Sequence, residues 1–494
     1  MNENQRHAGV LMHISTLHGE YSCGGFGQEC YDFVDFLAKS GFTVWQTLPF
    51  CMPDEHHSPY SSYSAFSLNY LFISLEALKE DGLLTESELK EAKQIVPYTC
   101  EFKRLDEERF ALLEKAASRV QDKTPIYSFL QSHPYIESFC LFMAKKQENQ
   151  NQPWTQWSRE NFDQKVYETW AFTQYTFLKQ WNKVRDYAHQ KGISVIGDVP
   201  IYLAYDSAEV WSHPEWFDLD ENKKQKTAAG CPPDYFSEEG QFWGNPIYRW
   251  DEMKKDGFRF WRDRMAFMFE LFDGVRLDHF RGFSSYWSIS ATAKTAKEGK
   301  WKKGPGRAFV RTMKEVAEGR LIIAEDLGEA TPDVKELLDY SGFPGMRVFQ
   351  FGFEGESNSS HLPHQYISNT VAYTGTHDND TLLGYIFGAN DGARQRLLAY
   401  IGEEGKTWEQ ACRTVVRQLY ASVADRVIFP IQDLLCFGND TRMNTPGLAA
   451  GNWGFRITKE QLFSLDTSHF YKLSDLYGRL PCEKHRVFDT RFPR

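Results

Sequence analysis

Short runs of apolar residues recur along most of the chain, each about as long as a β-strand and bounded by turn-forming residues. Eight of these runs predict strands, at residues 9–15, 43–49, 193–200, 272–279, 321–326, 346–353, 370–376 and 426–434. Between them, apolar positions repeat with the spacing of an amphipathic helix, most clearly at residues 28–41, 169–192 and 331–342. Gly41 and Gly192 are suited to end two of these helices, and Thr331 followed by Pro332 is suited to begin the third.

Strands that alternate with helices in this way predict an α/β fold, and eight is the number of strands that a (β/α)8, or TIM, barrel requires. An open doubly wound sheet is compatible with the same alternation, but the strand count favours the closed barrel. We therefore expect residues 1–494 to form a single barrel domain. The uneven strand spacing predicts two insertions: a mainly helical one at residues 51–168, after the second strand, and another at residues 204–260, after the third.

The composition is that of a globular protein with a large core, with 41% hydrophobic and 15% aromatic residues. The net charge is −11 and no basic run could follow a phosphate backbone, so nucleic acid is not an expected partner. No stretch approaches the roughly 18 apolar residues of a membrane span. The nine cysteines are scattered without a C-x-x-C pair, which favours free thiols over disulfides or a zinc site. With no signal-peptide pattern at the N-terminus, this predicts a cytoplasmic protein.

Ionisable side chains follow four of the predicted strands, at the end where a barrel carries its active site. Asp198 ends the third strand, Asp278 the fourth and Glu325 the fifth, and His377 with Asp378 follows the seventh. One acid after a strand is weak evidence, because Asp often caps the helix that comes next. Four are stronger evidence, because the C-terminal ends of all barrel strands meet at one rim. We expect these side chains to converge there.

The stretch FDGVRLDHFR, residues 272–281, places charged groups inside an apolar strand. Side chains alternate along a strand, so Arg276 and Asp278 share one face while Val275 and Leu277 share the other. If the apolar pair packs against surrounding helices, the charged pair points toward the barrel axis. Arg276 would then hold Asp278 in its ionised form, which is what a carboxylate nucleophile needs. A purely structural ion pair is the alternative that this motif alone leaves open.

A second carboxylate of different acidity would complete an enzyme that hydrolyses or transfers sugars with retention. In such enzymes one carboxylate attacks the anomeric carbon, and another, roughly 5–5.5 Å away, protonates the leaving oxygen. Glu325 ends an apolar run, where partial desolvation would raise its pKa and keep it protonated as a general acid. Asp378 could clamp sugar hydroxyls and favour a distorted ring near the transition state.

Several longer motifs occur together and in a characteristic order. They are HSPYSSYSAFSLN, IGDVPIY, PPDYFSEEGQFWGNPIY, FDGVRLDHFRGF, IIAEDLG, GTHDNDT and RMNTPG followed by GNW. On these motifs the sequence, from about Ala8 to Arg456, resembles the 4-α-glucanotransferases of the amylomaltase (disproportionating enzyme) family, a branch of the α-amylase clan. It departs from the family pattern at ISTLHGE, at CMPDEHH and at Phe455, which affects loop shape and sugar contacts rather than the acids.

The resemblance implies a reaction and a role for each acid. A segment of an α-1,4-glucan (maltodextrin) would be transferred to the 4-OH of glucose or of another maltodextrin, with no cofactor and no metal. Asp278 would be the nucleophile that forms a covalent glycosyl intermediate, Glu325 the acid and later the base, and Asp378 the transition-state stabiliser.

The resemblance also implies a set of residues that bind and orient the sugar. Some would line the pocket around the reacting glucose, and Tyr60 and Trp243 would offer aromatic faces. Others would lie on a loop within residues 228–248 that folds over the cleft, or on a second loop near the C-terminus. These implied substrate-binding residues are Ser58, Tyr60, Asp198, Gln241, Trp243, Arg276, His377 and Asn444.

Two other functions are compatible with parts of this pattern. An α-1,4-glucan hydrolase on the same scaffold would share every acid and differ mainly in the access of water. A carbohydrate-binding protein that has lost its activity is disfavoured, because all three acids are present. The aromatic segment 228–248 favours transfer, because a covering loop keeps water from the intermediate.

Overall fold

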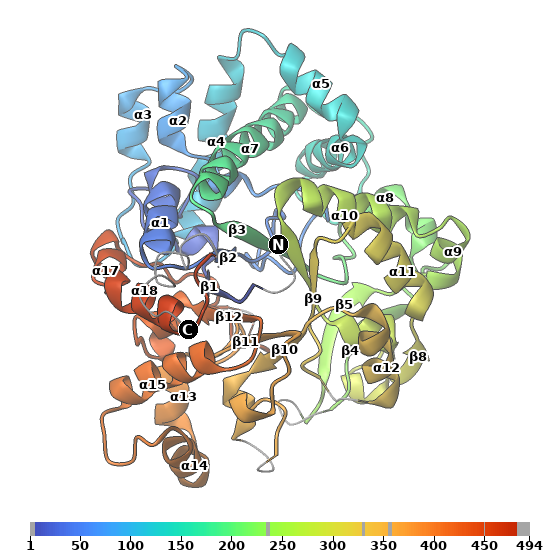
Figure 1. Cartoon of the computed structure of the whole chain (residues 1–494). Coiled ribbons are helices and arrows are strands. Elements are labelled where there is room, and N and C mark those ends of the chain that lie inside the picture. Colours follow the sequence, from blue (N-terminus) through green and yellow to red (C-terminus); the bar gives the residue numbers. More distant parts are fainter. Residues whose placement is uncertain (1–4, 234–237, 329–330, 354–357, 449, 482–494) are drawn as a thin grey trace.

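The computed structural model describes residues 5–233, 238–328, 331–353, 358–448 and 450–481. Within these residues, eight parallel strands close into a barrel, so the alternative of an open sheet is wrong (Figure 1). In order around the barrel they are β1 (His7–Leu11), β12 (Arg426–Pro430), β11 (Thr370–Tyr373), β10 (Gly345–Val348), β9 (Leu321–Ala324), β6 (Gly274–Leu277), β3 (Ser194–Val199) and β2 (Val44–Gln46).

Each of the eight predicted runs overlaps one barrel strand, but every predicted strand ends too late, and β1 and β10 begin before their runs, at His7 and Gly345. Residues 346–353 form β10 only as far as Val348, and a 3-10 helix follows at Phe349–Gly352. Residues 426–434 form β12 as far as Pro430, and the short helix α16 (Ile431–Leu434) follows. Phe349, Ile431 and Leu434 of these extensions are buried in a helical turn just as they would be in a strand, so hydropathy does not mark where the strand ends.

Helices surround the barrel and close it on the outside (Figure 1). Those that connect the barrel strands or follow the last one are α1 (Gln28–Lys39), α7 (Gln164–Gln190), α10 (Arg259–Leu271), α11 (Gly306–Ala317), α12 (Pro332–Ser341), α13 (Leu382–Gly388), α14 (Asp391–Ile401), α15 (Trp408–Ala421), α17 (Lys459–Phe463) and α18 (Thr467–Leu476). The predicted helices at 28–41, 169–192 and 331–342 correspond to α1, α7 and α12.

The long segment between β2 and β3 is helical and packs to one side of the barrel (Figure 1). Its helices are α2 (Leu75–Glu80), α3 (Glu86–Glu91), α4 (Phe102–Ser118), α5 (Thr124–Ser132) and α6 (Pro134–Glu148). They precede α7, which begins at Gln164 and leads into β3. The segment between β3 and α10 carries two further short helices, α8 (Ala208–Ser212) and α9 (Trp250–Lys255).

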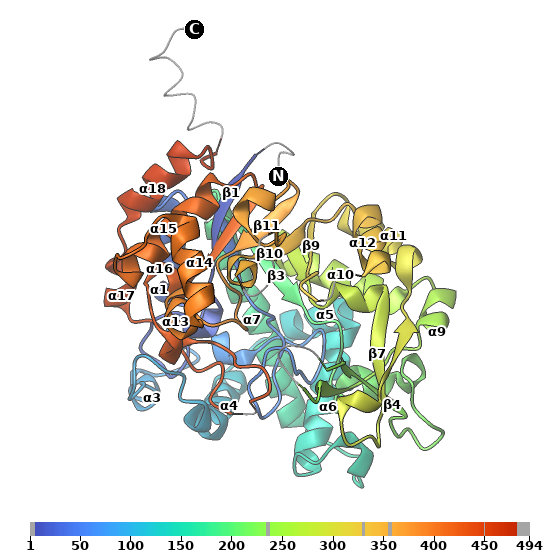
Figure 2. The ribbon, with the colours of Figure 1, turned by 90° about the horizontal axis from the view of Figure 1, so that it is seen from below.

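A second, antiparallel sheet lies beside the barrel, and the sequence analysis did not predict it. Its strand order is β5 (Gln241–Pro246), β4 (Thr227–Cys231), β7 (Ser285–Ser290) and β8 (Lys300–Lys303). The sheet joins part of the segment after β3 to a hairpin after β6, and Figure 2 shows β4 beside β7. These strands carry glycine, alanine, serine and lysine in place of a clear apolar alternation, which explains why the hydropathy pattern did not indicate them.

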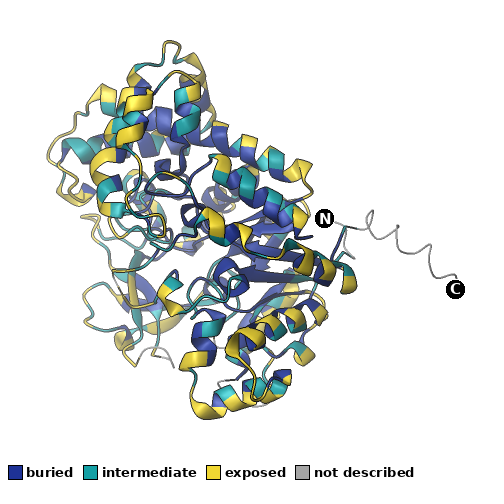
Figure 3. Cartoon of the chain, turned by 90° about the vertical axis from the view of Figure 1, so that its left-hand side faces the viewer, coloured by how far each residue is buried: buried dark blue, intermediate teal, exposed yellow. Residues whose placement is uncertain are grey.

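The core has two parts, one inside the barrel and one between the barrel and its helices. Inward-facing residues such as Ile196, Ile323 and Val371 form the inner cluster. Val275 and Leu277 belong to the outer cluster, together with apolar residues of the helices. Figure 3 shows buried residues on the strands and exposed ones mainly on the outer helix surfaces. Polar side chains at inward positions near the C-terminal ends of the strands are therefore exceptions that need partners.

Two further findings concern the described part of the chain. Its eight cysteines are all free, and Cys482 lies outside the described residues. Among its helices there is none with the length and apolar character needed to cross a membrane.

Candidate active site

Arg276 lies inside the barrel, on the face of β6 opposite Val275 and Leu277, and it is almost fully buried. Its Nη1 donates to both carboxylate oxygens of Asp198, at 2.9 and 2.8 Å, and its Nη2 lies 2.9 Å from Oδ1 of Asp278. Burial opposes the charge on Arg276, but the two carboxylates raise its pKa well above the ordinary value. The guanidinium therefore stays charged and fixes two acids at the ends of neighbouring strands.

Asp198 is buried at the centre of this network, and Tyr60 connects it to the other side of the barrel. Burial raises the pKa of Asp198 to about 6, although Arg276 acts in the opposite direction. The Tyr60 hydroxyl donates to Oδ2 of Asp198 at 2.7 Å. The Tyr60 ring stacks on His377 with the centroids 4.8 Å apart. One face of Tyr60 is thus occupied by an imidazole and is not open to a sugar.

Asp378 follows β11, two strands beyond β9 in the barrel, and its environment favours the ionised form. Its Oδ2 lies 3.1 Å from Nε2 of His377, and its Oδ1 accepts a hydrogen bond from Nδ2 of Asn444 at 2.6 Å. Burial alone would raise the pKa of Asp378, but His377 and the Asn444 amide lower it to about 2. Asp378 is therefore a carboxylate over the whole physiological pH range.

Glu325 has the opposite character, as the sequence analysis predicted. It follows β9, and burial raises its pKa to about 7 against the lowering effect of Arg276. Its Oε2 accepts the main-chain N–H of His279 at 2.8 Å, and its Oε1 accepts that of Leu327 at 2.8 Å. Two backbone donors thus fix the orientation of a carboxyl group that is partly protonated near neutral pH.

Asp278 and Glu325 follow the neighbouring strands β6 and β9. The turn that begins at His279, directly after Asp278, also contacts Glu325. The main chain continues the sheet hydrogen bonds past both strand ends, from Asp278 N to Val199 O and from Glu325 N to Leu277 O. His279 then adopts a left-handed conformation, with φ of 48°, which is unfavourable for a side chain of this kind. This turn directs the His279 N–H at the Glu325 carboxylate, so the strained backbone orients the candidate acid.

The second sheet places an aromatic side chain beside the acids. The Trp243 indole meets the His279 ring edge-on at 5.0 Å, and its Nε1 donates to Oε1 of Gln241 at 3.0 Å. Trp243 is 36% exposed, so part of its surface remains accessible. Residues 234–237, within the segment expected to cover the cleft, lie outside the described residues.

The structure brings all eleven predicted site residues into one network. Contacts run from Asn444 through Asp378, His377, Tyr60, Asp198 and Arg276 to Asp278, then through His279 to Glu325 and to Trp243 with Gln241. Ser58 joins it by accepting the main-chain N–H of Tyr60 at 3.3 Å. This arrangement places three carboxyl groups, one of them with a raised pKa, in one connected site, which is suited to a retaining displacement at an anomeric carbon.

Sequence reasoning missed several residues that shape this site. Trp453 lies 5.9 Å from both the Tyr60 and the His377 rings, in a left-handed backbone conformation. His279 and Leu327 act through main-chain N–H groups, which no residue type reveals. Arg442 and Trp453 belong to the RMNTPG and GNW motifs, so those motifs were the available signal for them.

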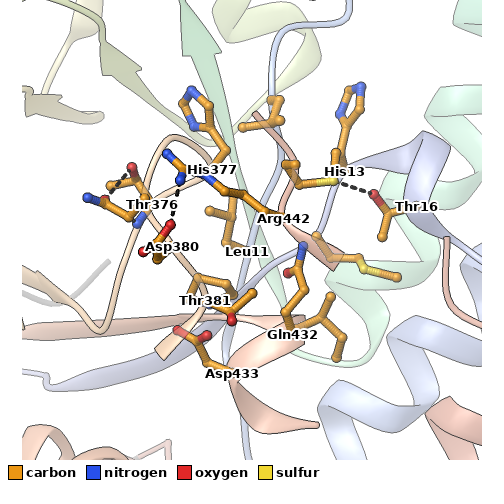
Figure 4. Close-up of a pocket in the computed structure, with 16 residues that line it drawn as sticks. Leu11, His13, Thr16, Thr376, His377, Asp380, Thr381, Gln432, Asp433 and Arg442 are labelled. Carbon is orange, nitrogen blue, oxygen red and sulfur yellow. Dashed lines mark hydrogen bonds and ion pairs between the residues drawn. The ribbon is translucent and has the colours of Figure 1, made fainter. Parts of the chain in front are cut away.

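A small cavity lies behind His377, between the ends of β1, β11 and β12 (Figure 4). Its volume is about 20 Å³, which is room for a single water molecule and not for a sugar. His13, Thr376, Asp380 and Arg442 line it. This cavity is therefore not the place where a sugar would bind.

Comparison with known proteins gives consistent matches over nearly the whole chain. The family described as 4-alpha-glucanotransferase matches residues 12–461. The 4-alpha-glucanotransferase of Streptococcus pneumoniae serotype 4 is 40% identical over 500 residues, covering 96% of this chain and 98% of that protein. That of Thermus thermophilus is 39% identical over 483 residues, covering 93% and 96%. The solved amylomaltase from Streptococcus agalactiae, in complex with acarbose, has a TM-score of 0.92 at 36% identity, covering 97% of this chain and all of that one.

Proposed function

The chain belongs to the 4-alpha-glucanotransferase family, and from this premise we propose which of its residues carry out the transfer and how. The donor is a maltodextrin, an α-1,4-linked glucan, and the acceptor is the 4-OH of glucose or of another maltodextrin. The observation that carries the assignment of roles is that Arg276 holds Asp278 at 2.9 Å, while two main-chain N–H groups hold Glu325. Burial raises the pKa of Glu325 to about 7, and His377 with the Asn444 amide lowers that of Asp378 to about 2, which supports different roles for these two acids.

In the first step the Asp278 carboxylate attacks the anomeric carbon of the donor. The bond from that carbon to the glycosidic oxygen breaks, and the leaving oxygen takes the proton of Glu325. The products are a glycosyl ester on Asp278, an ionised Glu325 and a shortened glucan. Arg276, at 2.9 Å from Asp278, fixes the direction of the nucleophile.

In the second step Glu325 acts as a base. It takes the proton of the acceptor 4-OH while the acceptor oxygen attacks the anomeric carbon and the Asp278 carboxylate leaves. The α configuration is retained because the carbon is inverted twice. Asp378 stays ionised throughout and stabilises the positive charge that develops on the sugar in both transition states.

The sugar-binding residues hold the reacting glucose in this geometry. Asp198 and His377, which Tyr60 bridges, form the wall of the pocket opposite Glu325. Trp243 and Gln241 lie over the edge of the site, where an acceptor sugar can stack and displace water. This favours transfer over hydrolysis, the alternative reaction of the same intermediate. A cytoplasmic location is also part of the proposal, and the free thiols support it.

The product profile from maltotriose tests this function. A transferase produces a ladder of longer maltodextrins together with glucose, whereas a hydrolase yields only maltose and glucose. Asp278→Asn serves as the inactive control in the same assay. Products that are all shorter than maltotriose would contradict the proposed transfer. Acarbose, which the Streptococcus agalactiae relative holds, is a suitable competing ligand.

A further inference from the structure

Arg442 is held against three acceptors at the rim of the barrel, next to the site. Its Nε donates to the main-chain oxygen of Asn444 at 2.7 Å, and its Nη2 donates to the main-chain oxygen of Asp378. Its Nη1 forms an ion pair with Asp380, which Figure 4 shows as a dashed line. The guanidinium has no described contact with a catalytic side chain, so its action on the site is indirect.

The two main-chain oxygens belong to the two loops that meet at Asp378. One loop, residues 376–380, follows β11, and the other, residues 442–453, follows β12. Asn444 connects the same loops, because its main-chain N donates to the oxygen of His377 at 3.1 Å and its Nδ2 donates to Asp378 at 2.6 Å. Arg442 thus fixes both partners of the side-chain hydrogen bond that orients Asp378.

We propose that Arg442 is a positioning residue, which sets the Asp378 carboxylate at the reacting sugar by clamping these two loops together. The inference rests on the proposed role of Asp378 as transition-state stabiliser. Only a planar guanidinium has donors in a fixed fork that reaches three acceptors at once, so lysine cannot replace it fully. A displacement of about 1 Å at a catalytic group costs on the order of 100-fold in rate.

Besides Arg442, the ties between the two loops named above are the two hydrogen bonds of Asn444, the residue that Arg442 itself holds. The cavity of about 20 Å³ lies beside Arg442 and Asp380, so this side of the 376–380 loop is not closely packed. Within the loop, Asn379 Oδ1 accepts the main-chain N and the Oγ1 of Thr376, which stiffens the turn but does not tie it to the second loop. When the Arg442 side chain is truncated, the enlarged cavity can admit a free guanidinium ion.

The test compares Arg442 with a second arginine that also holds main-chain oxygens. Arg479 is fully buried at the other end of the barrel, and it donates to the oxygens of His7, Tyr420, Ser422 and Ala424. Arg442→Lys, Arg442→Gln and Arg479→Lys are assayed with maltotriose for kcat and KM, and each is melted to obtain Tm. The pH profile of kcat is recorded for the three variants and the wild type.

We expect Arg442→Gln to lower kcat about 100-fold with little change in KM, and Arg442→Lys to fall between it and the wild type. The acid limb of the kcat profile should move to higher pH, because His377 and the Asn444 amide together lower the pKa of Asp378 and a displaced amide no longer contributes. Arg479→Lys should lower Tm while kcat of the folded protein stays unchanged. A fourth variant, Arg442→Ala, is assayed with and without guanidinium chloride, which should restore part of its activity at concentrations well below denaturing.

The outcomes separate this inference from the function on which it rests. If Arg442→Gln keeps wild-type kcat and pH profile while Asp378→Asn is inactive, the positioning role is wrong and the role of Asp378 stands. If Asp378→Asn keeps full activity, the proposed role of Asp378 fails first. If the variants at Arg442 and at Arg479 lower Tm and leave kcat unchanged, Arg442 is a structural residue and the inference is overturned. If KM of the Arg442 variants rises as steeply as kcat falls, Arg442 is a substrate-binding residue, and the inference is overturned as well.

Discussion

The two ends of the barrel each bury an arginine, and the two are held in different ways. At the C-terminal end, Arg276 pairs with the carboxylates of Asp198 and Asp278. At the N-terminal end, Arg479 donates to uncharged main-chain oxygens, including that of His7, the first residue of β1. Burial lowers the pKa of Arg479 to about 9, whereas the two acids raise that of Arg276 well above its ordinary value.

This difference separates groups that stabilise the barrel from groups that carry out the reaction. Main-chain oxygens accept hydrogen bonds from Arg479 and connect it to the segments next to β1 and β12. A buried cation with two carboxylates is a costlier arrangement, because three charges are removed from water together. It leaves Asp278 paired with Arg276 and partly exposed, on the strand next to that of Glu325, whose pKa is raised. Substitutions at the C-terminal end should therefore change turnover more than stability, and those at the N-terminal end the reverse.

The largest effect is expected from Asp278→Asn. The amide cannot form the glycosyl ester, so kcat with maltotriose should fall by at least about 10⁴-fold. Binding of maltotriose, measured by calorimetry, should be retained, because Arg276 still holds Asp198 and the pocket. An Asp278→Asn variant that keeps its activity would contradict the assignment of catalysis to the C-terminal end of the barrel.

Glu325→Gln should have the next largest effect. Loss of the proton donor is expected to lower kcat about 10³-fold. The amide oxygen of the variant can still accept one of the main-chain N–H groups of His279 and Leu327, but its NH2 group cannot accept the other. A donor with a fluoride leaving group needs no protonation, so its first step should be much less affected. If kcat of Glu325→Gln falls equally with maltotriose and with a glycosyl fluoride, Glu325 is not the proton donor of the first step.

The dependence of kcat/KM on pH tests the protonation assigned to Glu325 at the C-terminal end of the barrel. Glu325 must hold its proton in the first step, and burial raises its pKa to about 7, so kcat/KM should fall as pH rises through about 7, by about tenfold per pH unit at higher pH. Asp378, with a pKa of about 2, adds no acid limb above about pH 4. A rate that stays constant up to pH 9 would contradict the protonation assigned to Glu325.

The smallest effect is expected from Trp243→Ala. Loss of a ring that stacks on the acceptor should lower the ratio of transfer to hydrolysis about fivefold, which is the value of one aromatic contact of about 1 kcal/mol. Trp408→Ala is a matched control, because the two side chains are 36% and 37% exposed and Trp408 lies on α15. Equal ratios for both variants would mean that Trp243 does not govern the acceptor site.

Much of the fold could be predicted because the barrel strands are buried on both faces and therefore read as apolar runs. The position of Asp278 and Arg276 on one face followed from alternation alone, and the structure places them within 2.9 Å of each other. The antiparallel sheet could not be predicted, because β8 reads KWKK and β4 reads TAAGC. Each of these strands forms because it pairs with strands distant in sequence, and the local sequence carries no information about such partners.

The candidate acids could be predicted from residue type and strand position, but their orientation could not. Glu325 is aimed by main-chain N–H groups, and Arg442 acts on main-chain oxygens. Such contacts leave no pattern in the sequence, because every residue other than proline has the same backbone donor and acceptor. Tyr60 shows the same limit, since its predicted stacking surface is taken on one side by His377.

The central claim is that Asp278 forms a covalent bond with the sugar while Glu325 and Asp378 assist. The most direct measurement is the mass of Glu325→Gln protein incubated with an α-maltotriosyl fluoride, which needs no acid to react but cannot be released efficiently without the base. We predict that one glycosyl unit accumulates on the protein and that peptide mapping places it on Asp278. The absence of an adduct, or an adduct on Asp378 or any other residue, would contradict the account.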